Sequence, residues 1–168
     1  MGTATTTGSA FEALFDASFE TMKRLAYLLG ADDPENIAQE AFVRLHAGWH
    51  GLLDAGKAEA YLRRTVVNLS RSRLRHLRVV RRTPREPVPD AESAEATVLA
   101  RAEHRSLRAA LATLSQRQRQ VLVLRYWLEL DQAEIAETLG VAIGTVKATT
   151  SQALAKLRKA WPDEEGTR

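Results

Sequence analysis

The sequence predicts an all-α protein made of two small helical domains joined by a flexible linker. Apolar residues recur at three- and four-residue steps in several segments, and no segment shows the strict alternation of a strand. Residues 81–90 contain three prolines, which is typical of an extended linker. A chain of 168 residues has room for one ordinary domain or two small ones.

The first domain is expected over residues 11–79, after a disordered start at residues 1–10. Apolar residues from Phe11 to Leu29 follow a helical period, and Gly30 is placed to end that helix. Asp33 followed by Pro34 predicts the start of a second helix, which ends near residues 48–51. A third helix is expected from about residue 58 to 79, with Leu62, Val66 and Leu69 as its apolar stripe.

The second domain is expected over residues 101–161, after a linker at 80–100 and before a tail at 162–168. Its first helix covers about residues 99–114. Ser115 with Gln118, and Asp131 with Glu134, form capping-box patterns that start two further helices. Gly140 then supplies a tight turn, and a last helix from about Ile143 buries Val146, Ala153 and Leu157. Two short helices joined at a glycine turn predict a helix-turn-helix.

Composition excludes several classes of protein. With no cysteine, the chain has no disulfide, thiolate metal site or cysteine nucleophile. Its apolar runs are far shorter than the roughly 18 residues that a membrane span needs. The first ten residues lack the basic and apolar regions of a secretion signal, so we expect no membrane insertion and a cytoplasmic location.

The net charge of +3 hides a sharp asymmetry along the chain. Residues 1–60 carry four basic and nine acidic side chains, a net charge of −5, whereas residues 61–88 carry nine basic and one acidic, a net charge of +8. Residues 89–103 have a net charge of −3 and residues 104–168 a net charge of +3. The basic segment favours a polyanionic partner, and the acidic one a basic or mixed partner at another surface.

Four arginines form a stripe on the third predicted helix. At about 100° per residue, they fall about 160–220° from Leu62, opposite the apolar stripe. They have no acidic residue three or four positions away to relieve their repulsion, which favours nucleic acid over an ordinary solvated face. Asn68 lies at the edge of this stripe. Its amide can donate to and accept from the edge of a base, or it is a surface amide without a role. The stripe comprises Arg64, Arg71, Arg75 and Arg78.

The outward face of the last predicted helix carries small and polar residues. Small side chains such as Ala148 allow close approach to DNA, Lys147 and Thr149 can reach phosphates, and Gln152 can bond a base edge in two places. Trp49 and Tyr61 flank residues 50–57 and fit either stacking on an unpaired base or packing in a domain core.

Two groups of motifs resemble those of a known family. Residues 114–126 (LSQRQRQVLVLRY), 134–141 (EIAETLGV) and 144–147 (GTVK) look like region 4 of bacterial sigma factors. Residues 34–42 (PENIAQEAF) and 61–68 (YLRRTVVN) resemble region 2. With only these two regions and a short linker, the chain is similar to extracytoplasmic-function (ECF, group IV) sigma factors of an actinobacterial type. The likeness covers about residues 11–77 and 102–161.

The resemblance implies a sigma factor that binds core RNA polymerase, recognises the −10 and −35 promoter elements and helps to open DNA. The implied partners are the β′ clamp helices, the β flap, promoter DNA and an anti-sigma factor. Residues that match polymerase-contact positions are Glu35, Asn36, Gln39, Glu40 and Arg44. Matching the −10 contacts are Lys57, Tyr61, Arg64, Asn68, Arg71, Ser72, Arg75 and Arg78; matching the −35 contacts are Arg125, Thr145, Lys147, Ala148, Thr149, Ser151 and Gln152.

The chain departs from the family pattern in its last helix. Thr149 and Gln152 stand where many relatives have arginine, which weakens the attraction to phosphate. Ala142 occupies a position where a capping serine is frequent. The lack of that serine costs the helix about 0.5–2 kcal/mol. We therefore expect modest affinity from this domain alone.

Two other functions compete with this interpretation. A stand-alone helix-turn-helix transcription regulator would need only the second domain and leaves the arginine stripe unexplained. A metal enzyme is suggested by His46 and His50, spaced four residues apart, with Asp32, Asp33 and Glu35 before that helix. The cluster is explained by helix capping, so we expect no enzyme, no metal and no cofactor.

Overall fold

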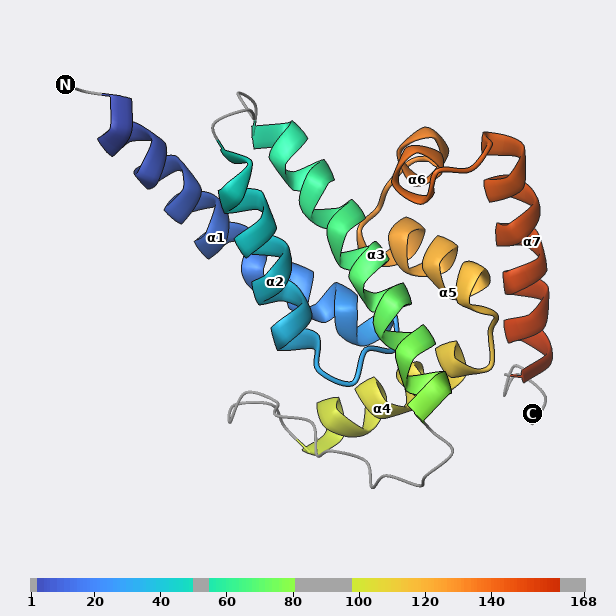
Figure 1. The fold of residues 1–168 in the computed structure, drawn as a ribbon. Helices are drawn as coiled ribbons and strands as arrows, with labels where there is room; N and C mark the ends of the chain where they lie inside the picture. The colour runs from blue at the N-terminus through green and yellow to red at the C-terminus, as the bar shows by residue number, and fades with distance from the viewer. Residues whose placement is uncertain (1–2, 50–54, 81–97, 161–168) are drawn as a thin grey trace. The chain divides into compact units, whose positions relative to one another are not determined.

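A computed structural model describes residues 3–49, 55–80 and 98–160. These residues form helices and connecting turns, with no strand among them (Figure 1). The chain divides into two compact units, one made of residues 1–27 and 31–79 and the other of residues 28–30 and 80–168. The predicted linker and tail fall largely outside the described ranges.

Three helices form the first unit: α1 (Thr3–Leu28), α2 (Pro34–Ala47) and α3 (Ala55–Val80). α1 begins at Thr3, within residues 1–10, where the sequence predicts a disordered start. Residues 3–10 contain no proline and one glycine, Gly8, which costs a helix only about 1 kcal/mol. A helix nucleated by its apolar positions further along therefore extends backwards through these residues.

The ends of the helices follow the local chemistry of their residues. Gly30 adopts φ +93°, and the next N–H, of Ala31, donates to the carbonyl of Ala26 over 3.0 Å, which closes α1. At the start of α2, the Asp33 carboxylate accepts from the N–H of Asn36 over 3.2 Å. The predicted cap at Asp33 is confirmed.

The core of the first unit is aliphatic in its middle and aromatic at one end. Phe11 meets the rings of His46 and Trp49 edge-on, at centroid distances of 4.9 and 5.3 Å. Phe42 of α2 packs against the rings of Phe11 and Phe15 in the same cluster, at centroid distances of 6.2 and 4.9 Å. The apolar faces of the three helices thus meet in one core. Its fully enclosed members include Met22, Leu25, Ala26, Ala38, Ala41, Leu45, Leu62 and Val66.

The second unit contains α4 (Val98–Ala112), α5 (Gln116–Leu122), a π-helical segment (Val123–Trp127), α6 (Gln132–Leu139) and α7 (Ile143–Ala160). Both α5 and α6 pack against α7. Both predicted capping boxes are confirmed: the Gln118 N–H donates to Ser115 Oγ over 3.2 Å, and the Glu134 N–H to Asp131 Oδ1 over 2.8 Å. Leu157 is half-buried rather than buried as expected.

The turn of the helix-turn-helix depends on Gly140. Gly140 adopts φ +65°, and the Val141 N–H donates to the carbonyl of Ala136 over 3.0 Å. A side chain at that φ would be strained, whereas glycine adopts it without cost. α7 then begins three residues later (Figure 1), as the sequence predicts.

The π-helical segment has no counterpart in the predicted elements. The N–H of Leu128 donates to the carbonyl of Val123, five residues earlier, and Glu129 adopts the left-handed φ of +54°. A π turn inserts an extra residue into a helix, and such turns are frequent at functional sites. Here the turn and the strained residue end the helix and bring Leu130 back into the core, at 7% exposure.

One ion pair ties α3 to a distant part of the first unit. Arg73 donates from Nε and Nη2 to the two oxygens of Asp32, each over 2.9 Å, and Asp32 lies in the turn between α1 and α2. These hydrogen bonds hold the pKa of the Asp32 carboxyl below its ordinary value, against the opposing effect of partial burial. The same bonds raise the pKa of Arg73.

The Asp32–Arg73 pair makes stability depend on pH in a defined window. The pKa of Asp32 is lower in the folded state than in the unfolded state, where it is about 3.9. The pair therefore stabilises the fold fully above about pH 3.9, and this contribution is lost as the pH falls through the pKa that Asp32 has in the folded state. We expect Asp32→Asn to lower the free energy of unfolding by up to about 1 kcal/mol at pH 7, since the pair is partly exposed. Thermal unfolding of both proteins between pH 3 and 7 measures this.

The difference between wild type and Asp32→Asn should shrink as the pH falls below about 4. Glu20→Gln is the control, because it breaks an exposed ion pair that lies within α1. A deficit of the same size at every pH would contradict the assignment.

Candidate nucleic-acid interface

The arginine stripe of α3 lies on the surface of the first unit. The side chains of Arg64, Arg75 and Arg78 are exposed and that of Arg71 is partly exposed. Within the described residues, none of the four lies within ion-pair distance of a carboxylate. A face with four like charges and no internal counter-charge attracts a polyanion such as the phosphates of a nucleic acid.

Asn68 and Arg71 form one polar group on this face. Arg71 donates from Nη2 to Oδ1 of Asn68 over 3.2 Å. Since a guanidinium carries only donors, the amide oxygen of Asn68 is its partner and the amide NH₂ points elsewhere. Asn68 therefore offers donors to a ligand on the stripe, from an exposed position.

The other predicted −10 residues occupy the same helix. Lys57 and Ser72 are exposed, and Tyr61 is 38% exposed, while its carbonyl accepts from Thr65 Oγ1. Ser70 on the same helix is buried at 1% exposure, because it lies four residues after Val66 on the core side. Trp49 packs against Phe11, and residues 50–54 lie outside the described chain.

On the second unit, α7 presents most of the residues predicted to meet the −35 element. Thr145, Lys147, Ala148, Ser151 and Gln152 are all exposed. Their side chains thus form the outward face of the helix that follows the glycine turn, where a recognition helix meets DNA.

Thr149 does not belong to this face. It is only 8% exposed, and it lies three residues after Val146 and four before Ala153, both fully buried. The prediction that Thr149 touches DNA is at odds with this position, because helical spacing places it on the core side.

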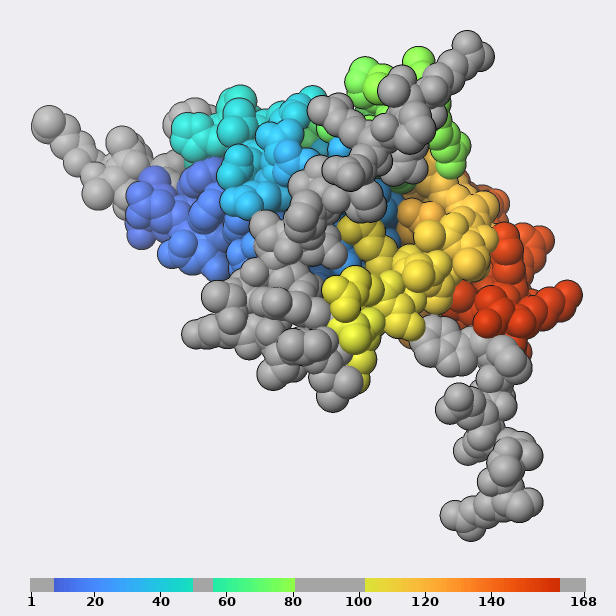
Figure 2. Space-filling view, turned by 90° about the horizontal axis from the view of Figure 1, so that it is seen from below, coloured from blue at the N-terminus to red at the C-terminus, as the bar shows by residue number. Residues whose placement is uncertain are grey.

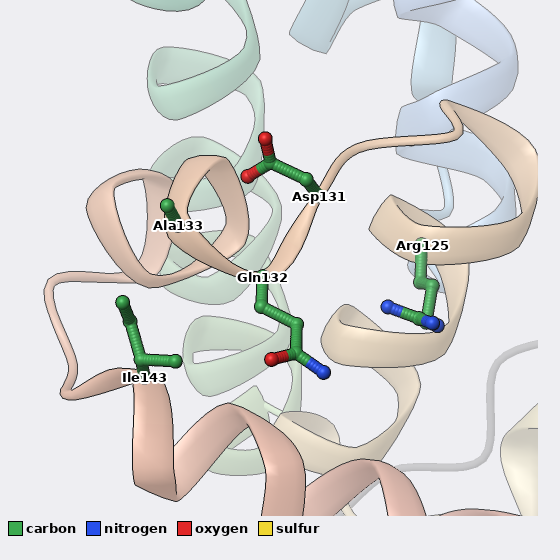
Figure 3. Close-up of a pocket in the computed structure, with 5 residues that line it drawn as sticks. All are labelled: Arg125, Asp131, Gln132, Ala133 and Ile143. Carbon is green, nitrogen blue, oxygen red and sulfur yellow. The ribbon is translucent and has the colours of Figure 1, made fainter.

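Arg125 lies in the π-helical segment beside a shallow hollow (Figure 3). Its guanidinium lies 5.9 Å from the centre of the Tyr126 ring, within the range of a cation–π contact. The hollow has a volume of about 440 Å³, and Figure 3 shows the polar ends of Arg125 and Gln132 extending to one side of it. Its lining is completed by Asp131, Ala133 and Ile143.

The sequence predicts a DNA contact for Arg125 but not for its neighbours in this hollow. Gln132 opens α6, and Ile143 opens α7 with 46% of its surface exposed. The available signal was their place at the first positions of the two predicted helices, where a helix-turn-helix faces DNA.

A third surface lies on the outer side of α2. The residues predicted to contact polymerase stand here, opposite the buried face of Ile37, Ala41 and Leu45. Glu35, Asn36 and Gln39 are exposed, and Glu40 forms an ion pair with Arg44 one turn later. Val43, at 68% exposure, adds an apolar residue to this otherwise polar face.

The structure gives the metal interpretation little to build on. His46 lies against the ring of Phe11, and Asp32 is engaged by Arg73. His50 lies outside the described residues. In the ranges that are described, no three histidine or acidic side chains gather as metal ligands. No helix in those ranges is both long and apolar enough to cross a membrane.

Comparison with known proteins identifies the family. Residues 104–157 match the family model described as Sigma-70, region 4. The chain is 37% identical over 127 residues to a protein named RNA polymerase sigma-E factor from Streptomyces antibioticus, covering 76% of this chain and 69% of the relative. It is 30% identical over 155 residues to the ECF RNA polymerase sigma factor SigM of Mycobacterium tuberculosis, covering 89% and 76%.

A solved structure shares the fold. The sigma factor RpoE of Bartonella quintana, in a complex with its anti-sigma factor NepR, superposes with a TM-score of 0.68 at 20% identity, over 89% of this chain and 95% of that one. The family model covers the second unit, and the relative SigM covers most of the chain. The chain therefore belongs to the ECF group of bacterial RNA polymerase sigma factors.

Proposed function

We propose that this sigma factor binds core RNA polymerase, contacts the −10 element through the stripe of α3 and the −35 element through α7, and helps to open promoter DNA. The observation that carries the proposal is the pair of exposed polar faces, one on each unit: four arginines without counter-charges on α3, and the outward face of α7. Two separate surfaces suit two separate stretches of one promoter.

The two DNA-binding surfaces differ in chemistry, which suits different tasks. The stripe on α3 is cationic, with Asn68 and Tyr61 at its margin, and such a surface binds a strand whose bases are accessible. The face of α7 has a single lysine among small and polar residues, which fits a duplex groove approached closely. We assign the −10 contacts to Lys57, Tyr61, Arg64, Asn68, Arg71, Ser72, Arg75 and Arg78, and the −35 contacts to Arg125, Thr145, Lys147, Ala148, Ser151 and Gln152.

Core polymerase would bind the outer face of α2 and the second unit. Glu35, Asn36, Gln39, Glu40 and Arg44 form a mixed polar face there, compatible with a basic or mixed helical partner. An anti-sigma factor is a further expected partner, as in the solved complex of RpoE with NepR. We expect these interactions to take place in the cytoplasm, with no chemistry catalysed by the chain itself.

The free energy needed to separate the DNA strands exceeds what the chain alone can supply, so a larger enzyme must drive the opening. Separating about ten base pairs costs on the order of 14 kcal/mol, at about 1.4 kcal/mol per step. Nonspecific binding to DNA, with dissociation constants of about 10⁻⁴ to 10⁻⁶ M, supplies only about 5–8 kcal/mol. The free chain therefore cannot hold a promoter open.

The first prediction concerns opening itself. With core polymerase, the protein should make the thymines of a promoter near the start site reactive to permanganate, whereas the protein alone should leave them unreactive. Reactive thymines with the protein alone would contradict the claim that polymerase drives the opening. Unreactive thymines in the presence of polymerase would contradict it as well. Co-purification with polymerase subunits separates this function from that of a stand-alone regulator.

The second prediction concerns the stripe. Replacing Arg71 and Arg75 together with alanine should reduce promoter opening at least tenfold while leaving the affinity for core polymerase unchanged, because these side chains belong to the stripe of α3 and not to the outer face of α2. Opening is followed by permanganate footprinting and affinity by titration of labelled protein. The control, Lys23→Ala with Arg105→Ala, removes the same charge from places off the stripe. Equal loss of opening and polymerase binding would contradict the role.

The third prediction concerns α7. Gln152→Ala should relax the preference at one base pair of the −35 element by about 1–3 kcal/mol, the usual value of a bidentate base contact. Selection from a library of randomised −35 sequences measures it. Thr149→Val is the matched control and should leave the base preference unchanged, since Thr149 is buried. If Thr149→Val weakened the base preference as much as Gln152→Ala, Thr149 would belong to the DNA-binding face after all.

A further inference from the structure

The packed part of α3 ends before its arginine-rich part. From Ala58 to Ser70 the helix buries a side chain in nearly every turn, but none of its residues after Ser70 is buried. Val79 is 74% exposed and Val80 is 46% exposed. Figure 2 shows the C-terminal end of α3, in green, standing out at the surface. Hydrophobic packing therefore holds residues 71–80 much less firmly than residues 58–70.

This end of the helix also repels itself. Residues 71–80 contain four arginines and no acidic residue. Arg71 and Arg75 are spaced by one turn, as are Arg75 and Arg78, and like charges at that spacing destabilise a helix. The helix dipole favours cations at a C-terminus and offsets part of this repulsion. An external carboxylate near the middle of the segment would offset more of it.

Asp32 supplies that carboxylate from outside the helix. Arg73 makes two parallel hydrogen bonds to it, and the two residues lie 41 positions apart in the sequence. Two parallel bonds fix orientation as well as distance. On the helical wheel, Arg73 falls about 20° from Leu62, almost opposite the stripe. Asp33 adds a second negative charge toward Arg73.

We infer that Arg73 is a positioning residue: through its ion pair with Asp32, it anchors the C-terminal end of α3 so that Arg71, Arg75 and Arg78 face DNA together. The inference rests on the proposed function of the stripe and extends it to two residues outside that surface. Because Arg73 is anchored, the stripe arginines are already oriented before DNA binds. Binding then costs less conformational entropy.

Exchange of backbone amides in the free protein tests the anchoring directly. Asp32→Asn should increase deuterium uptake in residues 71–80 about twofold to fivefold, the range that an ion pair of this exposure supports, and leave residues 58–70 unchanged. The double exchange Asp32→Arg with Arg73→Asp restores the pair in reverse and should return uptake to the wild-type level. Glu20→Gln should change nothing there. Unchanged uptake in Asp32→Asn would overturn the anchoring.

Promoter opening by the full chain with core polymerase tests the consequence. Asp32→Asn makes the protein more positive and frees Arg73, so a direct contact of Arg73 with phosphate would strengthen opening. Positioning instead predicts a twofold to fivefold loss of opening at fixed salt with polymerase affinity unchanged, and recovery in the double exchange. Equal or stronger opening by Asp32→Asn, or no recovery in the double exchange, would overturn the inference. If the wild-type protein opened no promoter, the proposed function would fail instead, whatever the exchange data showed.

Discussion

Unneutralised positive charge on the outer face of α3 is the constraint on which the rest of the first unit depends. The four stripe arginines have no carboxylate within ion-pair distance in the described chain, whereas Arg73 on the inner side and Arg44 on α2 each have one. A helix that keeps its counter-charges on the inner side and none on the outer side is arranged for an external polyanion. The aliphatic core and the aromatic cluster provide the support on which that face is displayed.

The two units achieve their stability in different ways. The first buries a continuous set of aliphatic side chains from three long helices and adds an aromatic cluster around Phe11. The second contains two short helices, α5 of seven residues and α6 of eight, which depend more on capping boxes, on the left-handed Gly140 and on packing against α7. Two small cores of this kind suit the proposed contacts of the two units with different stretches of one promoter.

Much of this architecture could be predicted because it is encoded locally. Caps at Asp33, Ser115 and Asp131 need only a side chain and a backbone N–H three residues away, and the turn at Gly140 needs only a glycine. The π-helical segment could not be foreseen, because it accompanies the burial of Leu124 and Leu130 in the tertiary structure, which no local pattern indicates. The Asp32–Arg73 pair joins residues 41 positions apart, so no local pattern indicates it. Thr149 matches a DNA-contact position of the family, but helical spacing places it on the core side of α7, at 8% exposure.

The salt dependence of promoter binding tests the central claim about charge most directly. Each cation that neutralises a phosphate of a single strand contributes about −0.7 to the slope of the logarithm of affinity against the logarithm of salt concentration. Replacing Arg64, Arg71, Arg75 and Arg78 together with alanine should therefore make the slope for the polymerase complex less steep by about 3. A slope equal to that of the wild type would show that the stripe does not contact phosphates and would contradict the account.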